Sequence, residues 1–381
     1  MTSPVSSDAP IAFIDLQAQR ARLGDAINTA IVKVLDHGRF IMGPEVAELE
    51  KRLAEMGGTA HCVSCSSGTD SLLLVLMAWG VGPGDAVFVP AMTFASTAEV
   101  VALTGATPVF CDVFDDTFNM DPASLEDAIT VAKDRGLNLA AVIPVDLFGQ
   151  PADYRAIQKI ADAHGMKVMA DSAQSFGGAL GGKPIGTFGD ATSVSFFPAK
   201  PLGCYGDGGA VLTDDADLAA KMRSLRVHGQ GTNKYDNVVV GLNARLDTIQ
   251  AAVLLAKLTI FEDEIEERQV VAARYNGALA GVCTPPAMID GGISAWAQYT
   301  IRVANRDAVA AALKEKGVPT AVYYPVALSD QPAYAHYPRA GNGTPVSAAL
   351  AHDVLSLPFH PYLDEATQDR IIAAVTEAAG S

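Results

Sequence analysis

The chain has 381 residues, of which 49% are hydrophobic and 18% are charged, a composition that favours a well-packed globular enzyme with two domains. Its formal net charge of −16 argues against nucleic acid or an anionic membrane surface as a partner, because no basic stripe is available to neutralise phosphates. No apolar run reaches the roughly 20 residues that span a bilayer, and no signal-peptide pattern follows Met1, so we expect a cytoplasmic location.

Cysteine and histidine spacing gives little support to a disulfide or a metal site. The five cysteines are an odd number and lie mostly in apolar runs, which favours reduced thiols. Cys62 and Cys65 have C-x-x-C spacing, but they fall in an expected strand, where residues three apart face opposite sides. The seven histidines are scattered, so we expect no metal site.

Short apolar runs alternate with helical patterns through the first part of the chain. The expected strands are 61–65, 86–90, 108–113, 140–145, 167–171, 192–197 and 210–213, and the expected helices are 71–79, 96–103, 122–133 and 154–164. Near-continuous apolar strands separated by helices predict an α/β domain with a mainly parallel seven-stranded sheet covered on both faces.

The pattern changes after this region. A long helix is expected over about 243–274, followed by a strand at 298–303, a helix at 306–316, a strand at 320–324 and a closing helix at 365–379. We therefore predict a large domain over residues 1–260 and a smaller C-terminal α+β domain over 261–381. The segment before Gly43 fits either domain.

Lys200 and Asp171 are the first candidates for chemistry. Lys200 lies between an apolar strand-type run and a glycine-rich loop, and Asp171 ends an earlier apolar run. Such a pair suits pyridoxal 5′-phosphate, since a lysine can hold the aldehyde as a Schiff base and a carboxylate can pair with the pyridine nitrogen. Taken singly, each also fits an ordinary role, Lys200 as a surface lysine and Asp171 as a strand-end cap.

A phosphate site is suggested by Ser66-Ser-Gly-Thr-Asp70, which directly precedes a helical run. Backbone N–H groups at such a turn can hold an anion, with Gly68 and Thr69 closest to it. An ordinary helix N-cap is the alternative. Ser195, five residues before Lys200, supplies a further phosphate contact or is only a strand residue.

Two more residues suit contacts to a pyridine ring. Phe94 lies where a strand gives way to a helix, at the ligand-binding edge of an open α/β sheet, and can stack on the ring or simply fill the core. Gln174, three residues beyond Asp171, can donate to the ring hydroxyl oxygen or be a solvated loop amide.

These segments, read in order, resemble the nucleotide-sugar aminotransferases of the DegT/StrS type, which are fold-type-I pyridoxal-phosphate enzymes. The resemblance covers nearly the whole chain and rests on Gly43-Pro-Glu-Val, the segments 66–70 and 93–94, Asp171-Ser-Ala-Gln174, 195–200 with Gly206-Asp-Gly-Gly, 241–247 and 355–363. Each piece is weak alone, whereas the ordered set is specific.

The resemblance implies a role for each candidate. Lys200 carries the cofactor, Asp171 pairs with its nitrogen, Gln174 touches its ring oxygen, and Phe94 stacks. Gly68, Thr69 and Ser195 hold the phosphate. Asn243 reaches the phosphate site of a neighbouring subunit, which makes the active site a property of a homodimer; otherwise Asn243 is the N-cap of the long helix.

Substrate contacts are predicted at Tyr323, Tyr324 and Arg226. The segment 322–331 departs from its relatives, with Tyr323, Ala327 and Ser329 where many have His, Pro and His. Arg39, Arg223, Arg226 and Arg245 are candidate cations for a diphosphate, each also fitting solvated surface charge.

The resemblance implies transfer of an amino group, from glutamate in most relatives, to a keto group of a nucleotide-linked sugar. The motif around Lys200 is most similar to members acting on UDP-linked 3-keto sugars, such as the 3-keto derivative of UDP-N-acetylglucosaminuronic acid, in the synthesis of surface polysaccharides such as the O-antigen of lipopolysaccharide. A dTDP- or UDP-linked 4-keto sugar is the alternative substrate. Other classes are a lyase or desulfurase, for which Cys204 would be the nearest cysteine, and a non-catalytic cofactor-binding regulator.

Overall fold

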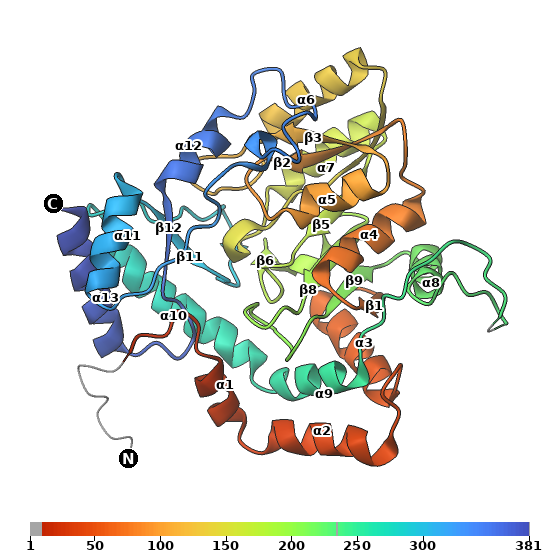
Figure 1. The fold of residues 1–381 in the computed structure, drawn as a ribbon, viewed down its shortest axis with the longest axis horizontal. Coiled ribbons are helices and arrows are strands. Elements are labelled where there is room, and N and C mark those ends of the chain that lie inside the picture. Colours follow the sequence, from red (N-terminus) through yellow and green to blue (C-terminus); the bar gives the residue numbers. More distant parts are fainter. Residues whose placement is uncertain (1–9, 234, 381) are drawn as a thin grey trace.

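A computed structural model describes residues 10–233 and 235–380, and its centre is a seven-stranded sheet (Figure 1). The strands lie in the order β1-β9-β8-β5-β4-β2-β3, and only β9 runs antiparallel to its neighbours in the sheet. Their bounds are β1 (His61–Cys65), β2 (Asp85–Pro90), β3 (Thr107–Cys111), β4 (Asn138–Val142), β5 (Lys167–Asp171), β8 (Ala191–Ser195) and β9 (Gly209–Thr213). The expected mainly parallel α/β sheet is confirmed.

Helices cover both faces of this sheet, as the near-continuous apolar strands require. Alternate residues of β2 show the division: Val87 and Val89 face α4, α5 and α8, whereas Ala86 and Phe88 face α6 and α7. The bounds are α4 (Gly68–Trp79), α5 (Ser96–Leu103), α6 (Pro122–Asp134), α7 (Tyr154–His164) and α8 (Ala216–Leu225). Parallel β5 and β8 therefore end at one edge of a sheet that is buried on both sides.

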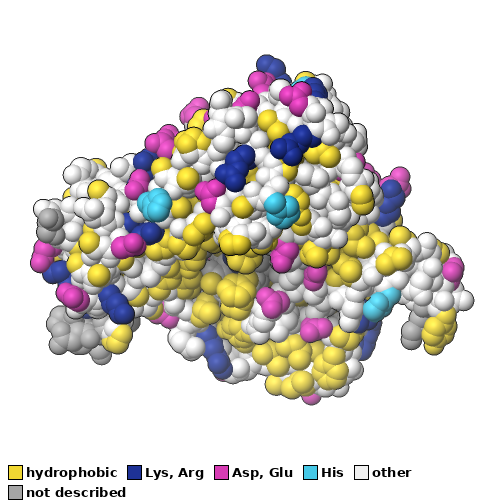
Figure 2. All heavy atoms as spheres, turned by 45° about the horizontal axis from the view of Figure 1, so that its top comes forward, with side chains coloured by type: hydrophobic (Ala, Val, Ile, Leu, Met, Phe, Trp, Pro, Cys, Tyr) yellow, Lys and Arg dark blue, Asp and Glu magenta, His cyan; other side chains and the backbone are white. Residues whose placement is uncertain are grey.

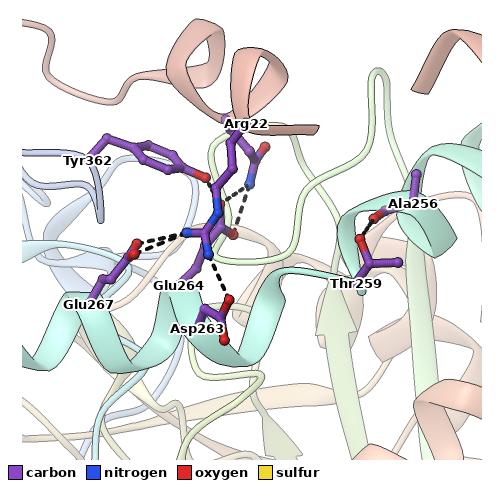
Figure 3. Close-up of polar contacts among 8 residues, drawn as sticks. Arg22, Ala256, Thr259, Asp263, Glu264, Glu267 and Tyr362 are labelled. Atoms are coloured by element: carbon purple, nitrogen blue, oxygen red, sulfur yellow. Dashed lines mark hydrogen bonds and ion pairs between the residues drawn. The ribbon is translucent and has the colours of Figure 1, made fainter. Parts of the chain in front are cut away.

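The helices outside these layers differ from the expected single long helix over 243–274. Helix α9 (Thr248–Lys257) ends before α10 (Phe261–Leu279), and Thr259 Oγ1 donates to the carbonyl of Ala256 at the break, 2.7 Å away (Figure 3). Asp247, not Asn243, is the N-cap of α9, so the alternative role of Asn243 as a cap is wrong. Helices α1 (Leu16–Leu23), α2 (Ala26–His37) and α3 (Pro44–Gly57) precede the sheet.

The C-terminal part contains a two-stranded antiparallel sheet of β11 (Tyr299–Arg302) and β12 (Val354–Leu357). The expected strand at 320–324 is wrong, because there only Ala321 forms a bridge, to Ser356. The helices are α11 (Arg306–Glu315), α12 (Pro345–Asp353) and α13 (Glu365–Ala379). The remaining elements are β6 (Ala179–Leu180), β7 (Lys183–Pro184), β10 (Gly292–Ile293), and the 3-10 helices η1 (Leu147–Gly149), η2 (Ile185–Thr187) and η3 (Leu328–Asp330).

Core residues are shared across the expected domain boundary. Ile11 packs with Tyr275, Tyr299 and residues of α13 in one hydrophobic cluster, whereas Leu328 packs with the large sheet. The division at residue 260 stays a prediction. In the part of the chain that the structure describes, no helix is long and apolar enough to cross a membrane.

A polar cluster ties α1 to α10 and to the segment before α13 (Figure 3). The Glu264 carboxylate is buried and accepts hydrogen bonds from Gln19 Nε2, at 3.1 Å, and from the Tyr362 hydroxyl. Arg22 pairs with Asp263 at 2.7 Å and with Glu267 at 3.0 Å on the outer side. Burial lowers the pKa of both Lys257 and Arg268, and the charge of Glu264 opposes that shift in each. Glu264 is therefore the counter-charge for two buried cations.

We expect Glu264→Ala to reduce the free energy of unfolding by about 3–5 kcal/mol, because it leaves buried positive charge uncompensated. Asp263→Ala is the matched control on the same helix. Its side chain is 67% exposed, so loss of its ion pair with Arg22 should cost at most about 1 kcal/mol. Denaturant midpoints and slopes of the two variants measure the difference, and equal losses would contradict the role given to Glu264.

Candidate active site

A cavity of about 420 Å³ lies at the carboxyl ends of β5 and β8, beside the N-terminus of α4. Seven of the predicted cofactor residues line it: Gly68, Thr69, Phe94, Asp171, Gln174, Ser195 and Lys200. Tyr323 and Tyr324 also line it. Segments distant in the sequence thus meet where an open α/β sheet places its ligand.

Asp171 is the last residue of β5 and is only 4% exposed. Its Oδ2 accepts from Thr97 Oγ1 at 2.9 Å, and its Oδ1 accepts from the N–H of Ala173 at 3.3 Å. Burial raises the pKa of Asp171, while these two hydrogen bonds and the charge of Lys200 lower it. The carboxylate is held in place by donors that favour its charged form.

Lys200 is half-buried in the turn that follows β8, where its N–H donates to the carbonyl of Phe197 at 2.9 Å. Burial lowers the pKa of the Lys200 amine to about 8, and the negative charge of Asp171 partly opposes this shift. A lysine with such a pKa has a much larger neutral fraction near physiological pH than one with the usual pKa of 10.5. It can act there as a nucleophile and as a base.

The turn before α4 is a helix cap whose geometry also suits an anion. Ser67 is the N-cap, and its side chain accepts from the N–H of Asp70 at 3.0 Å. Gly68 and Thr69 face the cavity beside Ser195. A Cβ on Gly68 would lie 2.6 Å from Ser195 Cβ, so only glycine allows α4 to approach β8 this closely. The first turn of α4 can therefore hold a phosphate next to the Ser195 hydroxyl.

Gln174 is buried, which rules out the alternative of a solvated loop amide. Its Oε1 accepts from the N–H of Phe148 at 2.7 Å, and Phe148 adopts a positive φ of 62°. Because Oε1 is occupied, Nε2 is the atom left to donate, and a hydrogen bond links Gln174 to the hydroxyl of Tyr324. The amide thus presents a donor to the cavity side, as contact with a ring oxygen requires.

Three aromatic residues form a wall of the cavity. Phe94 is 56% exposed, so it does not fill the core. Its ring centroid lies 6.2 Å from that of Tyr324, which in turn lies 5.8 Å from that of Tyr323. An exposed ring on the wall of the cavity is available to stack on a planar ligand.

Arg226 corrects one prediction, because it does not line the cavity. Its guanidinium is buried, pairs with Glu50 at 2.5 Å and donates to the carbonyl of Ser64 at 2.7 Å. A buried arginine committed to an internal carboxylate holds β1 against α3 and is not free to bind a sugar. Arg39, Arg223 and Arg245 are also absent from the lining, where Lys200 is the single cation among the described residues.

Asn243 is exposed and does not line the cavity of its own chain. Its Oδ1 accepts from Arg245 Nη2 at 2.7 Å.

Cys204 is buried in the turn after Lys200 and donates to two backbone carbonyls, and burial raises the pKa of its thiol to about 11. Such a thiol is unsuited to desulfurase chemistry.

Thr97 and Gln298 were not predicted from the sequence. Thr97 could have been found from the sequence, because it lies three residues after Phe94, in the first turn of a helix that begins at the ligand-binding edge of the sheet. Gln298 lines the cavity with Oε1 buried and unpaired, but it comes from the C-terminal part of the chain. Nothing local in the sequence places it there.

Several known proteins with similar sequences are aminotransferases. Residues 21–376 match the DegT/DnrJ/EryC1/StrS aminotransferase family. The chain is 50% identical to a UDP-2-acetamido-2-deoxy-3-oxo-D-glucuronate aminotransferase of Pseudomonas aeruginosa, over 96% of this chain and 99% of that one. It is 42% identical to a UDP-N-acetyl-3-dehydro-alpha-D-glucosamine 3-aminotransferase of Acidithiobacillus ferrooxidans, over 97% and 98% of the two chains.

Solved structures agree with these sequence relatives. A DegT DnrJ EryC1 StrS aminotransferase from Brucella abortus matches with a TM-score of 0.96 and 53% identity, over 97% of this chain and 100% of that chain. NtdA of Bacillus subtilis, solved with the bound cofactor PMP, matches with a TM-score of 0.88 and 28% identity, over 100% and 87% of the two chains. The chain belongs to the DegT/DnrJ/EryC1/StrS aminotransferase family and is a pyridoxal-phosphate-dependent enzyme.

Proposed function

We propose that this enzyme transfers an amino group, with glutamate as donor, to the 3-keto group of a UDP-linked sugar, the reaction named for its 50%-identical relative. The observation that carries the proposal is the meeting of Lys200, Asp171 and Gln174 in one cavity, beside the first turn of α4. A surface-polysaccharide role and a cytoplasmic location go with such a substrate.

The residues that line the cavity suit pyridoxal phosphate. The α4 turn and Ser195 would hold the phosphate, Phe94 would stack on the ring, and Gln174 Nε2 would donate to the ring oxygen. When bound, the cofactor supplies an electron sink that stabilises negative charge at the substrate carbon. Among the described residues, no cation lies within ion-pair distance of Asp171. Its carboxylate would hold a proton on the ring nitrogen.

Lys200 would then have two tasks. As a nucleophile, its neutral amine captures the cofactor, and once displaced by the amino donor it is close enough to carry a proton to and from the substrate carbon. Capture of the cofactor and uptake of a proton both need the neutral amine, and the lowered pKa increases the fraction of that form. The half-buried position of the side chain thus serves binding and proton transfer alike.

We expect the rate at which the apoenzyme captures pyridoxal phosphate to rise with pH around a midpoint near 8, the pKa of Lys200, rather than near the usual 10.5. Stopped-flow absorbance measures the rate, and borohydride reduction followed by peptide mapping should find the cofactor on Lys200. Lys200→Ala should retain the cofactor non-covalently and lose turnover by several orders of magnitude.

Lys257 is an internal control in the peptide mapping that follows borohydride reduction. Burial also lowers its pKa to about 8, but its Nζ donates to the carbonyl of Gly203 and does not line the cavity. It should remain unlabelled. Cofactor on Lys257 would show that a lowered pKa without the cavity geometry is sufficient, and would refute the assignment to Lys200.

Substrate class is tested by running the half-reaction backwards. Amino-sugar nucleotides are mixed with the pyridoxal form, and conversion to the aminated cofactor is followed by absorbance. We expect UDP-linked 3-amino sugars to react at least about tenfold faster than dTDP- or UDP-linked 4-amino sugars, the difference that about 1.4 kcal/mol in the transition state produces. Faster reaction of a 4-amino sugar would replace the 3-keto proposal with its alternative.

We also propose that the enzyme is a homodimer in which Asn243 contacts the cofactor phosphate site of the partner subunit. The segment between α8 and α9 projects from the body of the molecule (Figure 1), and Val238 and Val240 on it are exposed, the latter by 85%. Phe40, Ile41, Phe94 and Phe197 are exposed as well, and hydrophobic side chains gather on the face seen in Figure 2. Exposed apolar area of this kind favours an interface.

Charge supports the same arrangement. The described lining of the cavity holds one lysine and two aspartates, Asp171 and Asp207, whereas the proposed ligands carry a phosphate and a diphosphate. A second chain would bring the polar segment around Asn243 and Arg245 to that site. Tyr323 and Tyr324 would contact the sugar from the same chain.

We expect heterodimers of Lys200→Ala and Asn243→Asp chains to regain activity that neither parent has, because one of their two sites receives both intact residues. Asn243→Asp is chosen because it would place a carboxylate against a phosphate. Activity is measured after the two differently tagged chains are co-expressed and purified as mixed dimers. A monomer in solution, or mixed dimers no more active than the parents, would reject the shared site.

A further inference from the structure

Two threonines lie behind Asp171, in line with one another. Thr97, in the first turn of α5, is fully buried, and its Oγ1 lies 2.9 Å from Asp171 Oδ2. Thr93 is also buried and lines the cavity, with its Oγ1 3.2 Å from Thr97 Oγ1. Hydroxyl, hydroxyl and carboxylate therefore form a chain that starts at the cavity wall and ends on Asp171.

The direction of this chain follows from counting hydrogens. A threonine hydroxyl has one proton to donate, and an ionised carboxylate can only accept. Thr97 must therefore donate to Asp171, and it must accept from Thr93. Both hydroxyl protons point toward the carboxylate, which is the arrangement that stabilises its negative charge.

We propose that Thr97, supported by Thr93, is a positioning residue that fixes the Asp171 carboxylate and keeps the proton it shares with the cofactor on the pyridine nitrogen. The inference rests on the proposed pairing of Asp171 with that nitrogen. It does not depend on which sugar or amino donor the enzyme uses.

The sign of the effect can be worked out from the groups that face Asp171. Burial favours its neutral form, whereas Thr97, the Ala173 N–H and Lys200 favour the anion, in decreasing order of effect on its pKa. The hydroxyls of Tyr324 and Tyr154 are also close enough to Asp171 for its negative charge to contribute to the raised pKa of each, although burial is the larger cause. Without the Thr97 donor the carboxylate becomes more basic and competes better for the shared proton. The proton then moves from the ring nitrogen toward Asp171.

Thr97→Val is the direct test, since valine has nearly the shape of threonine without the hydroxyl. Enzyme loaded with pyridoxal phosphate that carries nitrogen-15 in the ring reports the protonation of that nitrogen by its chemical shift. A hydrogen bond to a charged group corresponds to about one to two pKa units. We expect the shift in Thr97→Val to move toward that of neutral pyridine, with kcat reduced about tenfold or more and KM for the amino donor little changed.

Three further variants make the outcome specific. Thr97→Ser keeps the donor and should restore the wild-type chemical shift. Thr93→Val should shift in the same direction as Thr97→Val but less, because it removes only the second link. Thr104→Val removes a hydroxyl at the end of the same helix that donates to the carbonyl of Val101, and it should change nothing.

A wild-type nitrogen shift in Thr97→Val would overturn the proposal. If that variant does not fold, Thr93→Val and Thr97→Ser decide: an unchanged shift in the first, or a lost ring proton in the second, would also overturn it. A lost ring proton in all four variants would indicate general damage to the site and reject the specific role.

Discussion

The proposed active site needs a carboxylate that is removed from water and yet carries a charge. Asp171 can hold a proton on a ring nitrogen only as an anion, but its burial at the end of β5 favours the neutral acid. Three groups in the surrounding structure stabilise the anion: a hydroxyl from α5, a backbone N–H from the loop after Asp171, and an amine from the turn after β8. These come from separate segments, so the sheet must form before the charge is stable.

A second buried carboxylate, Asp146, fixes the loop that follows Asp171. Its Oδ2 accepts from the hydroxyls of Ser172 and Ser175, at 2.7 and 2.6 Å, and its Oδ1 accepts from the Ala152 N–H and the Tyr154 hydroxyl. Burial raises the pKa of Asp146 to about 6, even though all four donors lower it. Because Gln174 lies between the two serines, Asp146 fixes the position of a proposed cofactor contact that it does not touch.

Helices and strands that depend on local interactions were predicted correctly from the sequence. Strand β5, helices α5 and α7 and the closing helix α13 have the expected bounds, since β5 is an apolar run and the three helices follow helical patterns, of which α7 and α13 are capped by Asp153 and Asp364. The cavity residues were predicted because sheet order brings the ends of parallel strands together. Arg226 was placed wrongly, because its pairing with Glu50, 176 positions away, leaves no mark in the neighbouring sequence. The missing strand at 320–324 has the same cause, since β-type composition forms a strand only where a partner edge extends far enough.

The orientation of Gln174 shows why a site of this kind needs more than the right residue types. An amide can present either its oxygen or its nitrogen, and only the nitrogen can donate to a ring oxygen. The choice is made by the N–H of Phe148, which occupies the oxygen and reaches it through a backbone turn with positive φ at Phe148 and Gly149. A Cβ at Gly149 would lie 2.6 Å from the Trp296 nitrogen, in the segment before β11. The orientation of the Gln174 amide is thus fixed by close packing between the sheet edge and the C-terminal part of the chain, a constraint that depends on the complete fold.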